Sequence, residues 1–194
     1  MPPWRTTSSG TTISAPSEPS LDMPRYARPT AHEYAPFYAG YVASVPEGDV
    51  LSILAQQTDD LRSLLNPLPP ATWHHRYAPG KWSVVEVLGH LCDVERIMSY
   101  RALRFARGDS TPVPGLEEND YVPMGRFDQR APHSLLAEFE MVRAATLALF
   151  RHLPDDAPER VGTANGADVS VRALLYIITG HQRHHAQVVR ERYL

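Results

Sequence analysis

The sequence predicts an all-α protein, a four-helix bundle with long loops between its helices. Four segments repeat apolar residues with the 3.6-residue period of an amphipathic helix, and no segment has a convincing strand pattern. Stretches that contain proline and glycine separate these segments. Because each amphipathic helix must bury its apolar face against another element, a bundle around one core is the arrangement that we expect.

The chain is expected to consist of a tail, residues 1-30, and one helical domain, residues 31-194. As far as about Asp22 the tail is rich in Ser, Thr and Pro. Such a composition buries too little apolar surface to offset the entropy lost on ordering, so we expect disorder there. The remaining length, with 43% apolar residues over the whole chain, suits a single core.

The first half of the domain contains two predicted long helices. An aromatic, partly helical stretch from Glu33 to Val45 precedes them, and its aromatic side chains are most simply core residues. Asp49 is suited to cap a helix from Val50 to about Leu65. Ser83 and Glu86 form a capping box that opens the second long helix, which Gly108 is expected to stop after Arg107.

The second half contains a long connection and two further helices. Gly108 to His133 has no periodicity, and its acidic residues Glu117, Glu118 and Asp120 lie where a loop could close over a site. A third helix is predicted from near Ser134 to Pro154. The Asn165-Gly166 pair favours a tight turn. Ser170 is expected to cap the last helix, an apolar run from Val171 to Val189.

Composition excludes several classes of protein. The net charge of -3 lacks the basic excess of a nucleic-acid binder. Cys92 is the only cysteine, so there is no disulfide framework and no thiolate zinc cluster. We interpret it as a small buried hydrophobe. No run approaches the length of a membrane span, and a cytoplasmic location is expected.

The chemistry is concentrated in the last helix. His181 and His185 are four residues apart, so their imidazoles share one helix face and can bind one divalent metal. His184 competes with His185, but His185 continues the apolar line from Leu174 and Ile178. His90, at the border of the second helix's apolar stripe, is a candidate third ligand, since bundle cores often assemble ligands from facing helices. Three such ligands leave a position open, as in catalytic sites.

A catalytic base is harder to assign. Gln182 stands where an H-E-x-x-H protease motif has its glutamate, and an amide cannot accept a proton. Asp93, one turn beyond His90, is the candidate catalytic residue, and Asp120 is an alternative. Asp93 could instead pair with a nearby arginine or support a ligand. The arginines of the same helix have two interpretations. They form a solvated face, or one of them binds an anionic group of the substrate.

Four motifs together resemble the DinB-like superfamily, which includes the YfiT-like proposed metal-dependent hydrolases and is distinct from the polymerase that shares the DinB name. They are Gly80-Lys81-Trp82-Ser83, the Gly89–Arg96 segment, the Gly162–Gly166 segment and Gly180-His181-x-x-His184-His185. The resemblance covers roughly Glu33 to Leu194. It implies a four-helix bundle, usually a homodimer, with zinc or nickel held by His90, His181 and His185.

The resemblance also implies a small-molecule substrate, because some relatives are S-transferases that use bacillithiol, mycothiol or glutathione. We therefore expect a metal-dependent enzyme that activates a low-molecular-weight thiol or water for S-transfer or hydrolysis. The alternative is a non-enzymatic, stress-related metal-binding protein with a dimeric bundle. Neither a nucleic acid nor a membrane is an expected partner.

Overall fold

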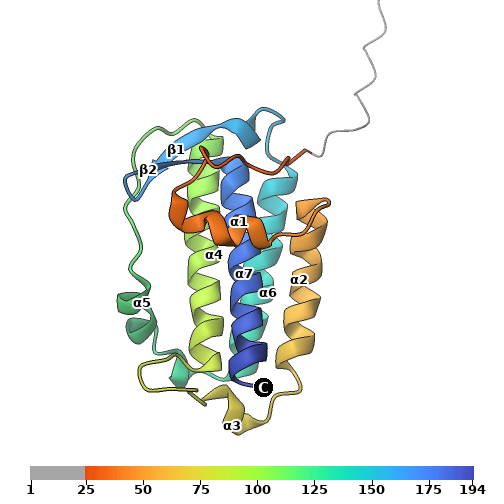
Figure 1. Cartoon of the computed structure of the whole chain (residues 1–194), viewed down its shortest axis with the longest axis vertical. Coiled ribbons are helices and arrows are strands. Elements are labelled where there is room, and N and C mark those ends of the chain that lie inside the picture. The colour runs from red at the N-terminus through yellow and green to blue at the C-terminus, as the bar shows by residue number, and fades with distance from the viewer. Residues whose placement is uncertain (1–24) are drawn as a thin grey trace, which may run out of the picture.

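The computed structural model describes residues 25–194, and four long helices form its bundle (Figure 1). α2 and α4 each pack against both α6 and α7, so the order around the bundle is α2, α6, α4, α7. This confirms the predicted four-helix architecture. The four helices are α2 (Val50–Leu65), α4 (Val84–Ala106), α6 (Pro132–Arg151) and α7 (Val171–Arg192).

The neighbouring helices α4 and α6 run in the same direction, which explains the long connection between them. α4 follows α3 (Pro70–Trp73), and the ring of Trp73 in α3 contacts His133 in the first turn of α6. Both helices therefore begin at the same end of the bundle. The chain must return along the whole bundle after Ala106, and Figure 1 shows this connection descending on one side, with α5 (Glu118–Gly125) on the way.

Short elements complete the fold. α1 (Ala39–Ser44), preceded by the 3-10 turn η1 (Pro36–Tyr38), crosses the bundle and packs on α7. The remaining 3-10 turns are η2 (Phe127–Gln129) and η3 (Ala157–Glu159). The Gly108–His133 connection thus contains helical turns, although no period marks them, because α5 is only eight residues long and carries Pro123.

The expectation of no strand was wrong at one place. β1 (Val161–Ala164) and β2 (Ala167–Ser170) pair antiparallel, with Val161 opposite Ser170. The turn between them is the predicted one: Asn165 and Gly166 have φ of 52° and 74°, as a tight hairpin requires. Strands of four residues are too short for a period to be visible in the sequence.

Residues 25–30, which lie before the expected boundary at residue 31, pack against the bundle. Tyr26 is 1% exposed, and its hydroxyl donates to the carbonyl of Phe150 at 2.6 Å. Arg28 donates to the carbonyl of Val42 at 2.7 Å and so ties the segment to α1. The disorder predicted for the start of the tail concerns residues outside the described part.

The predicted helix signals act as expected. The Asp49 carboxylate accepts from the Ser52 amide at 3.0 Å, and the capping box of Ser83 and Glu86 is formed. Gly108, with φ of 76°, follows the end of α4. α6 begins two residues earlier than predicted, at Pro132, because proline is well tolerated in the first turn of a helix.

The apolar core is divided into two clusters by a buried polar layer at mid-height. One cluster surrounds Phe105, Phe150 and Ile177, and the other surrounds Leu88, Phe139 and Val189. Each long helix contributes buried polar residues between the two clusters. They are Gln57, His90, Glu95, Arg143, Thr146, Thr179, His181 and Gln182. None of the helices in residues 25–194 is long and apolar enough to cross a membrane.

Candidate metal centre

Three histidines meet at this polar layer, where α4 packs beside α7. His90 lies in the second turn of α4, and His181 and His185 lie on successive turns of α7. His90 and His181 are only 4% and 7% exposed, and His185 is half-buried. His184 remains exposed at the surface. The structure therefore brings together the three histidines proposed as ligands and separates the competing one from them.

The imidazoles point their nitrogens at one another. The Nε2 atom of His181 is 3.0 Å from Nε2 of His90 and 3.1 Å from Nε2 of His185. One ligand atom from each of the three residues lies within 4.8 Å of the other two. A single ion placed between them would be in reach of all three.

Burial keeps these imidazoles neutral. It lowers the pKa of His90 to about 4 and, with the charges of His90 and His184, lowers the pKa of His185 to about 3. The pKa of His181 is lowered well below its usual value, first by burial and then by the neighbouring histidines. Near pH 7 all three rings are therefore neutral, which is the form that binds a metal.

Hydrogen bonding alone does not satisfy this cluster. A neutral imidazole has one N–H and one lone pair, yet Nε2 of His181 has two imidazole nitrogens within hydrogen-bond distance. Whichever tautomer His181 adopts, that nitrogen can serve only one of them well. A cation between the three nitrogens would accept a lone pair from each, so the donor set fits a divalent metal that binds imidazole.

Aromatic rings form the walls of the cluster. The Trp82 ring lies 4.8 Å from that of His90 and is stacked with that of His185, and Tyr41 packs edge-on against His181 at 5.4 Å. Gly180 makes the Tyr41 contact possible, because a Cβ atom there would lie 2.0 Å from the Tyr41 carbonyl oxygen. The glycine before the first histidine therefore lets α1 approach α7 and cover the site.

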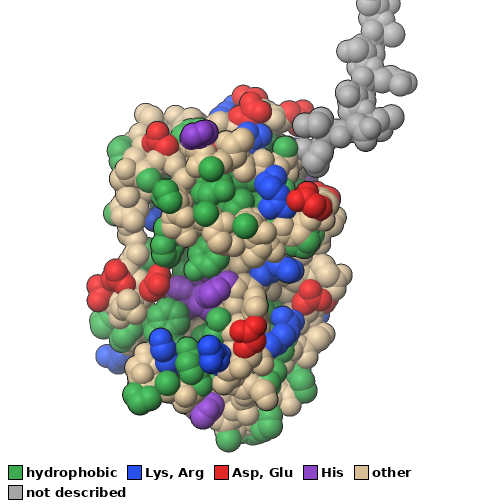
Figure 2. All heavy atoms as spheres, viewed as in Figure 1, with side chains coloured by type: hydrophobic (Ala, Val, Ile, Leu, Met, Phe, Trp, Pro, Cys, Tyr) green, Lys and Arg blue, Asp and Glu red, His purple; other side chains and the backbone are tan. Residues whose placement is uncertain are grey.

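Two cavities border the three-histidine cluster. A cavity of about 360 Å³ is lined by His181 and Tyr41, and one of about 250 Å³ by His185 and Trp82. Glu118, in the first turn of α5, lines both. Figure 2 shows imidazoles reaching the surface in the middle of one face, with acidic side chains beside them over α5. The site is thus accessible to small molecules.

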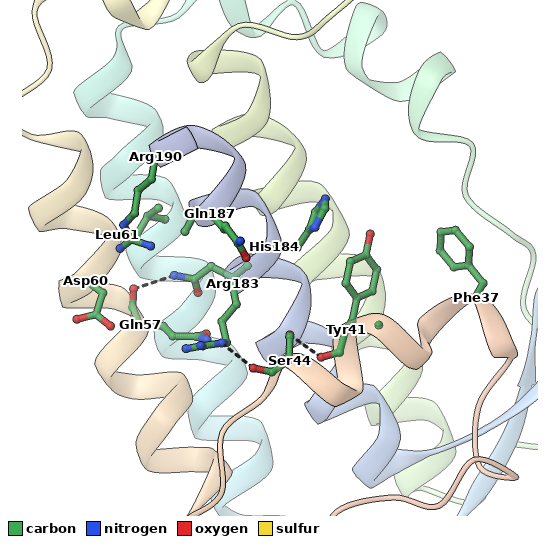
Figure 3. Close-up of a pocket in the computed structure, with 13 residues that line it drawn as sticks. Phe37, Tyr41, Ser44, Gln57, Asp60, Leu61, Arg183, His184, Gln187 and Arg190 are labelled. Carbon is green, nitrogen blue, oxygen red and sulfur yellow. Dashed lines mark hydrogen bonds between the residues drawn. The ribbon is translucent and has the colours of Figure 1, made fainter. Parts of the chain in front are cut away.

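A larger cavity, about 590 Å³, lies elsewhere, between α1, α2 and α7 (Figure 3). His184, Arg183 and Gln57 line it, but none of the three clustered histidines does. Tyr41 lines both this groove and the 360 Å³ cavity, so its ring stands between them. The amide of Gln182 donates to the backbone oxygen of Gln57 at 2.8 Å, so Gln182 belongs to the polar layer.

Asp93, the predicted base, lies outside the three-histidine cluster. Its carboxylate is 4.0 Å from the guanidinium of Arg96, which also pairs with Glu138 of α6 at 2.7 Å. Burial raises the pKa of Asp93, and the charge of Arg96 opposes this shift. This placement supports the alternative role, an ion pair with a nearby arginine, here Arg96 in the same helix. Asp120 is exposed on α5.

Sequence reasoning did not identify Tyr41 and Trp82 as walls of the site, and it named Glu118 only as one of several acids on a loop that could close over a site. They come from three separate segments of the chain, and no spacing relates them to the histidines. Phe37 had been expected in the core, but it is 72% exposed and lines two cavities. Cys92 is buried as predicted, and burial raises the pKa of its thiol to about 12, so it is no nucleophile.

The fold and this histidine cluster define a helical bundle in which three histidines could hold a metal ion. The family model of the DinB superfamily matches residues 53–189, and the chain belongs to that superfamily. The match begins in α2 and includes all three clustered histidines. No curated protein matches the chain in sequence.

Two solved structures share the fold. One is YfiT from Bacillus subtilis, described as a probable metal-dependent hydrolase with an unusual four-helix bundle topology. It is 19% identical, with a TM-score of 0.67 over 76% of this chain and 87% of that one. The other is a mycothiol-dependent maleylpyruvate isomerase. It is 18% identical, with a TM-score of 0.61 over 75% of this chain and 61% of that one.

Proposed function

We propose that this protein is a metal-dependent enzyme that acts on a small molecule, with His90, His181 and His185 as its metal ligands. The observation that carries the proposal is the convergence of three neutral imidazoles, two buried and one half-buried, beside two cavities. A closed structural zinc site has four protein ligands and needs no cavities. The names of the two structural neighbours, one metal-dependent and one thiol-dependent, agree with it.

The metal would be zinc or nickel, since both bind imidazole well. With three protein ligands it would leave a position open, where a bound water or thiol has a lowered pKa. The chain's own residues perform the remaining tasks. Trp82 and Tyr41 fix the orientation of the imidazoles and shield them from bulk water, and the two cavities beside the cluster can accept two reactants.

Glu118 is the carboxylate best placed to accept a proton from a reactant, because it lines both cavities. Asp93 is the second candidate. Burial raises its pKa, which suits a base, but its carboxylate is paired with Arg96. Activity measurements on Glu118→Gln and Asp93→Asn decide between them. We expect the first to lower kcat strongly and the second to act mainly through stability; the reverse outcome would restore Asp93.

The ligand assignment is tested by metal analysis of the purified protein. We expect about one divalent ion per chain, as three ligands on one ion require, and its loss from His90→Ala, His181→Ala and His185→Ala. His184→Ala is the matched control and should keep the metal. Retention of metal in His185→Ala together with its loss from His184→Ala would overturn the ligand set.

Thiol transfer and hydrolysis are separated by their co-substrate. The metal-loaded protein is incubated with bacillithiol, mycothiol or glutathione and a bimane electrophile, and the loss of thiol is followed. A parallel assay follows the release of nitrophenol from an activated ester. We expect metal-dependent turnover in the thiol assay, because two separate cavities suit two reactants. Turnover of the ester alone would identify a hydrolase.

A non-enzymatic, stress-related metal-binding protein is the second candidate function. It would be favoured by a stoichiometric metal together with no turnover in either assay. Both functions are compatible with a homodimer, which the family resemblance led us to expect and which sedimentation of the full chain would test.

A further inference from the structure

Arg101 is a buried arginine that has no carboxylate partner among residues 25–194. It is 4% exposed. Its guanidinium donates to the carbonyl of Pro114 at 2.8 Å and lies 3.5 Å from the sulfur of Met98, which are neutral groups. The neighbouring arginines behave differently: Arg96 pairs with Glu138, and Arg104 pairs with Asp109. Within residues 25–194, no carboxylate lies within ion-pair distance of Arg101.

A buried charge of this kind is costly to keep. A guanidinium has five N–H donors, and the two contacts described occupy only part of them. Arginines that are removed from water are normally paired with an anion, because the desolvation of an unpaired charge is expensive. The position of Arg101 is therefore explained if it meets an anion that is not part of the chain.

The guanidinium borders the same cavity as the metal cluster. Arg101 and His181 both line the 360 Å³ cavity. On α4, His90, Val94, Met98 and Arg101 follow one another at helical spacing, so they share one face. Arg101 is eleven residues beyond His90, roughly 16 Å along the helix axis, and arginine side chains in helices lean back toward the N-terminus. The guanidinium thus lies beyond the histidines along one continuous cavity.

The wall of the cavity around Arg101 is largely apolar, and Asn119, Asn165 and two acids line other parts of it. Val94, Met98, Leu116 and Ile177 line it beside Arg101. Glu117 and Glu118 also line it, but both are exposed, and Glu117 accepts from the backbone and side chain of Asn119. Arg101 is thus the only buried charge among the residues that line this cavity. The acids at the edge would repel a free anion and select for a ligand that also has an apolar body.

We propose that Arg101 binds the carboxylate of a small molecule whose apolar part fills this cavity and whose other end reaches the three histidines. The proposal rests on the proposed function in taking this cavity as the substrate cavity. It adds the class of substrate, an apolar carboxylate. A planar carboxylate matches the fork of the guanidinium and can accept two parallel hydrogen bonds.

The test is binding of benzoate, compared with its neutral analogue benzamide, to the full chain by calorimetry. Both metal-loaded and chelator-treated protein are titrated, because benzoate could also bind a metal. We expect benzoate to bind more tightly than benzamide in both forms. Arg101→Gln should weaken benzoate binding by about 10- to 100-fold, as expected for a lost charge-assisted contact, and leave benzamide unchanged.

Arg104→Gln is the matched control, since it removes an arginine one turn further along α4 that does not line the cavity. It should bind benzoate like the parent. If Arg101→Gln does not fold, Arg101→Lys keeps the charge but loses the fork, and benzoate binding should then fall by about 3- to 10-fold. Benzoate binding unaffected by these Arg101 variants, or lost entirely on removal of the metal, would overturn the proposal.

The benzoate binding test does not depend on whether the protein is an enzyme. Arg101-dependent benzoate binding by a protein that holds no metal would support the carboxylate subsite and overturn the proposed function. A functional metal centre with no preference for benzoate over benzamide would do the opposite.

Discussion

The polar layer of this bundle contains two clusters that differ in how their groups are satisfied. The carboxylate of Glu95 accepts two hydrogen bonds from Arg143, both at 2.7 Å, and Arg143 also donates to the carbonyl of Leu54. The three histidines lie in the same layer, but the lone pairs and N–H groups of their imidazoles cannot all be paired with one another.

The surroundings of these two clusters also differ. The Glu95–Arg143 pair is enclosed between α4, α6 and α2, with side chains 4% and 1% exposed. The histidine cluster opens to two cavities. A buried polar cluster that is complete in itself holds helices together, whereas one that is incomplete and accessible indicates a ligand. By the same reasoning Arg101, which is buried and has no acidic partner in the described part of the chain, indicates a second ligand group.

The largest expected effect comes from removing the central histidine. His181→Ala should abolish metal binding and reduce activity by more than about 100-fold, since loss of groups that only support ligands already costs 10–100-fold. Stability should change less than activity when measured without metal. Activity is followed with the thiol assay and metal by elemental analysis. Full activity of a metal-free His181→Ala variant would contradict the conclusion that the histidine cluster, unlike the Glu95–Arg143 pair, serves function.

Breaking the Glu95–Arg143 ion pair should lower stability and leave the metal content unchanged. Glu95→Gln leaves the Arg143 charge buried without its partner, so the free energy of unfolding should fall by about 3–5 kcal/mol. Replacing both residues, as Glu95→Leu with Arg143→Met, should recover most of this loss. Arg96→Ala removes a half-exposed partner of Glu138 and should cost less than about 1 kcal/mol. Urea unfolding measures all three, and loss of metal in Glu95→Gln would link the two clusters.

An intermediate effect is expected where α1 meets the histidine helix. In Gly180→Ala the new Cβ would overlap the Tyr41 carbonyl oxygen, so α1 must shift away from α7. The cost should be about 1–3 kcal/mol, typical of overpacking. Because Tyr41 forms a wall of the cluster, activity should fall as well. Gly40→Ala is the control, since a Cβ at that position meets no atom within 4 Å. Equal stability of the two variants would contradict the close contact.

The smallest effect is the pH dependence of the metal-free protein near neutrality. The pKa of each clustered histidine is lowered in the folded state, to about 4 for His90 and about 3 for His185. The unfolded chain takes up these protons near pH 6.5, so stability is greatest above that pH and falls as the pH drops below it. From pH 7.5 to 6.5 the three histidines should together cost about 1 kcal/mol.

Unfolding at several pH values, with chelator present, measures this slope. His90→Leu should reduce it by about a third, because one of three titrating groups is removed. A slope unchanged by this variant would show that other groups cause the pH dependence. Added zinc should raise stability by about the same amount at pH 6.5 and pH 7.5, because the folded imidazoles are already neutral in this range and need not lose protons to bind it.

The sequence by itself determined the helices, their caps and most of the ligand candidates. The 3.6-residue period located α2, α4, α6 and α7, because each buries one face in a common core. The spacing of His181 and His185 placed both on one side of α7, and Ser83 and Ser170 marked where the helices begin. These are local consequences of helix geometry, so they can be read without knowing how the helices pack.

Tertiary structure decided what surrounds the histidines. Because α4 and α6 are parallel neighbours, the connection between them returns along the bundle and brings Glu118 to the cavities. The approach of α1 at Gly180 places Tyr41 beside His181. Whether Asp93 and Arg101 meet a partner depends on which helix face lies opposite them. Helical period fixes the direction of a side chain, but only packing fixes what it meets.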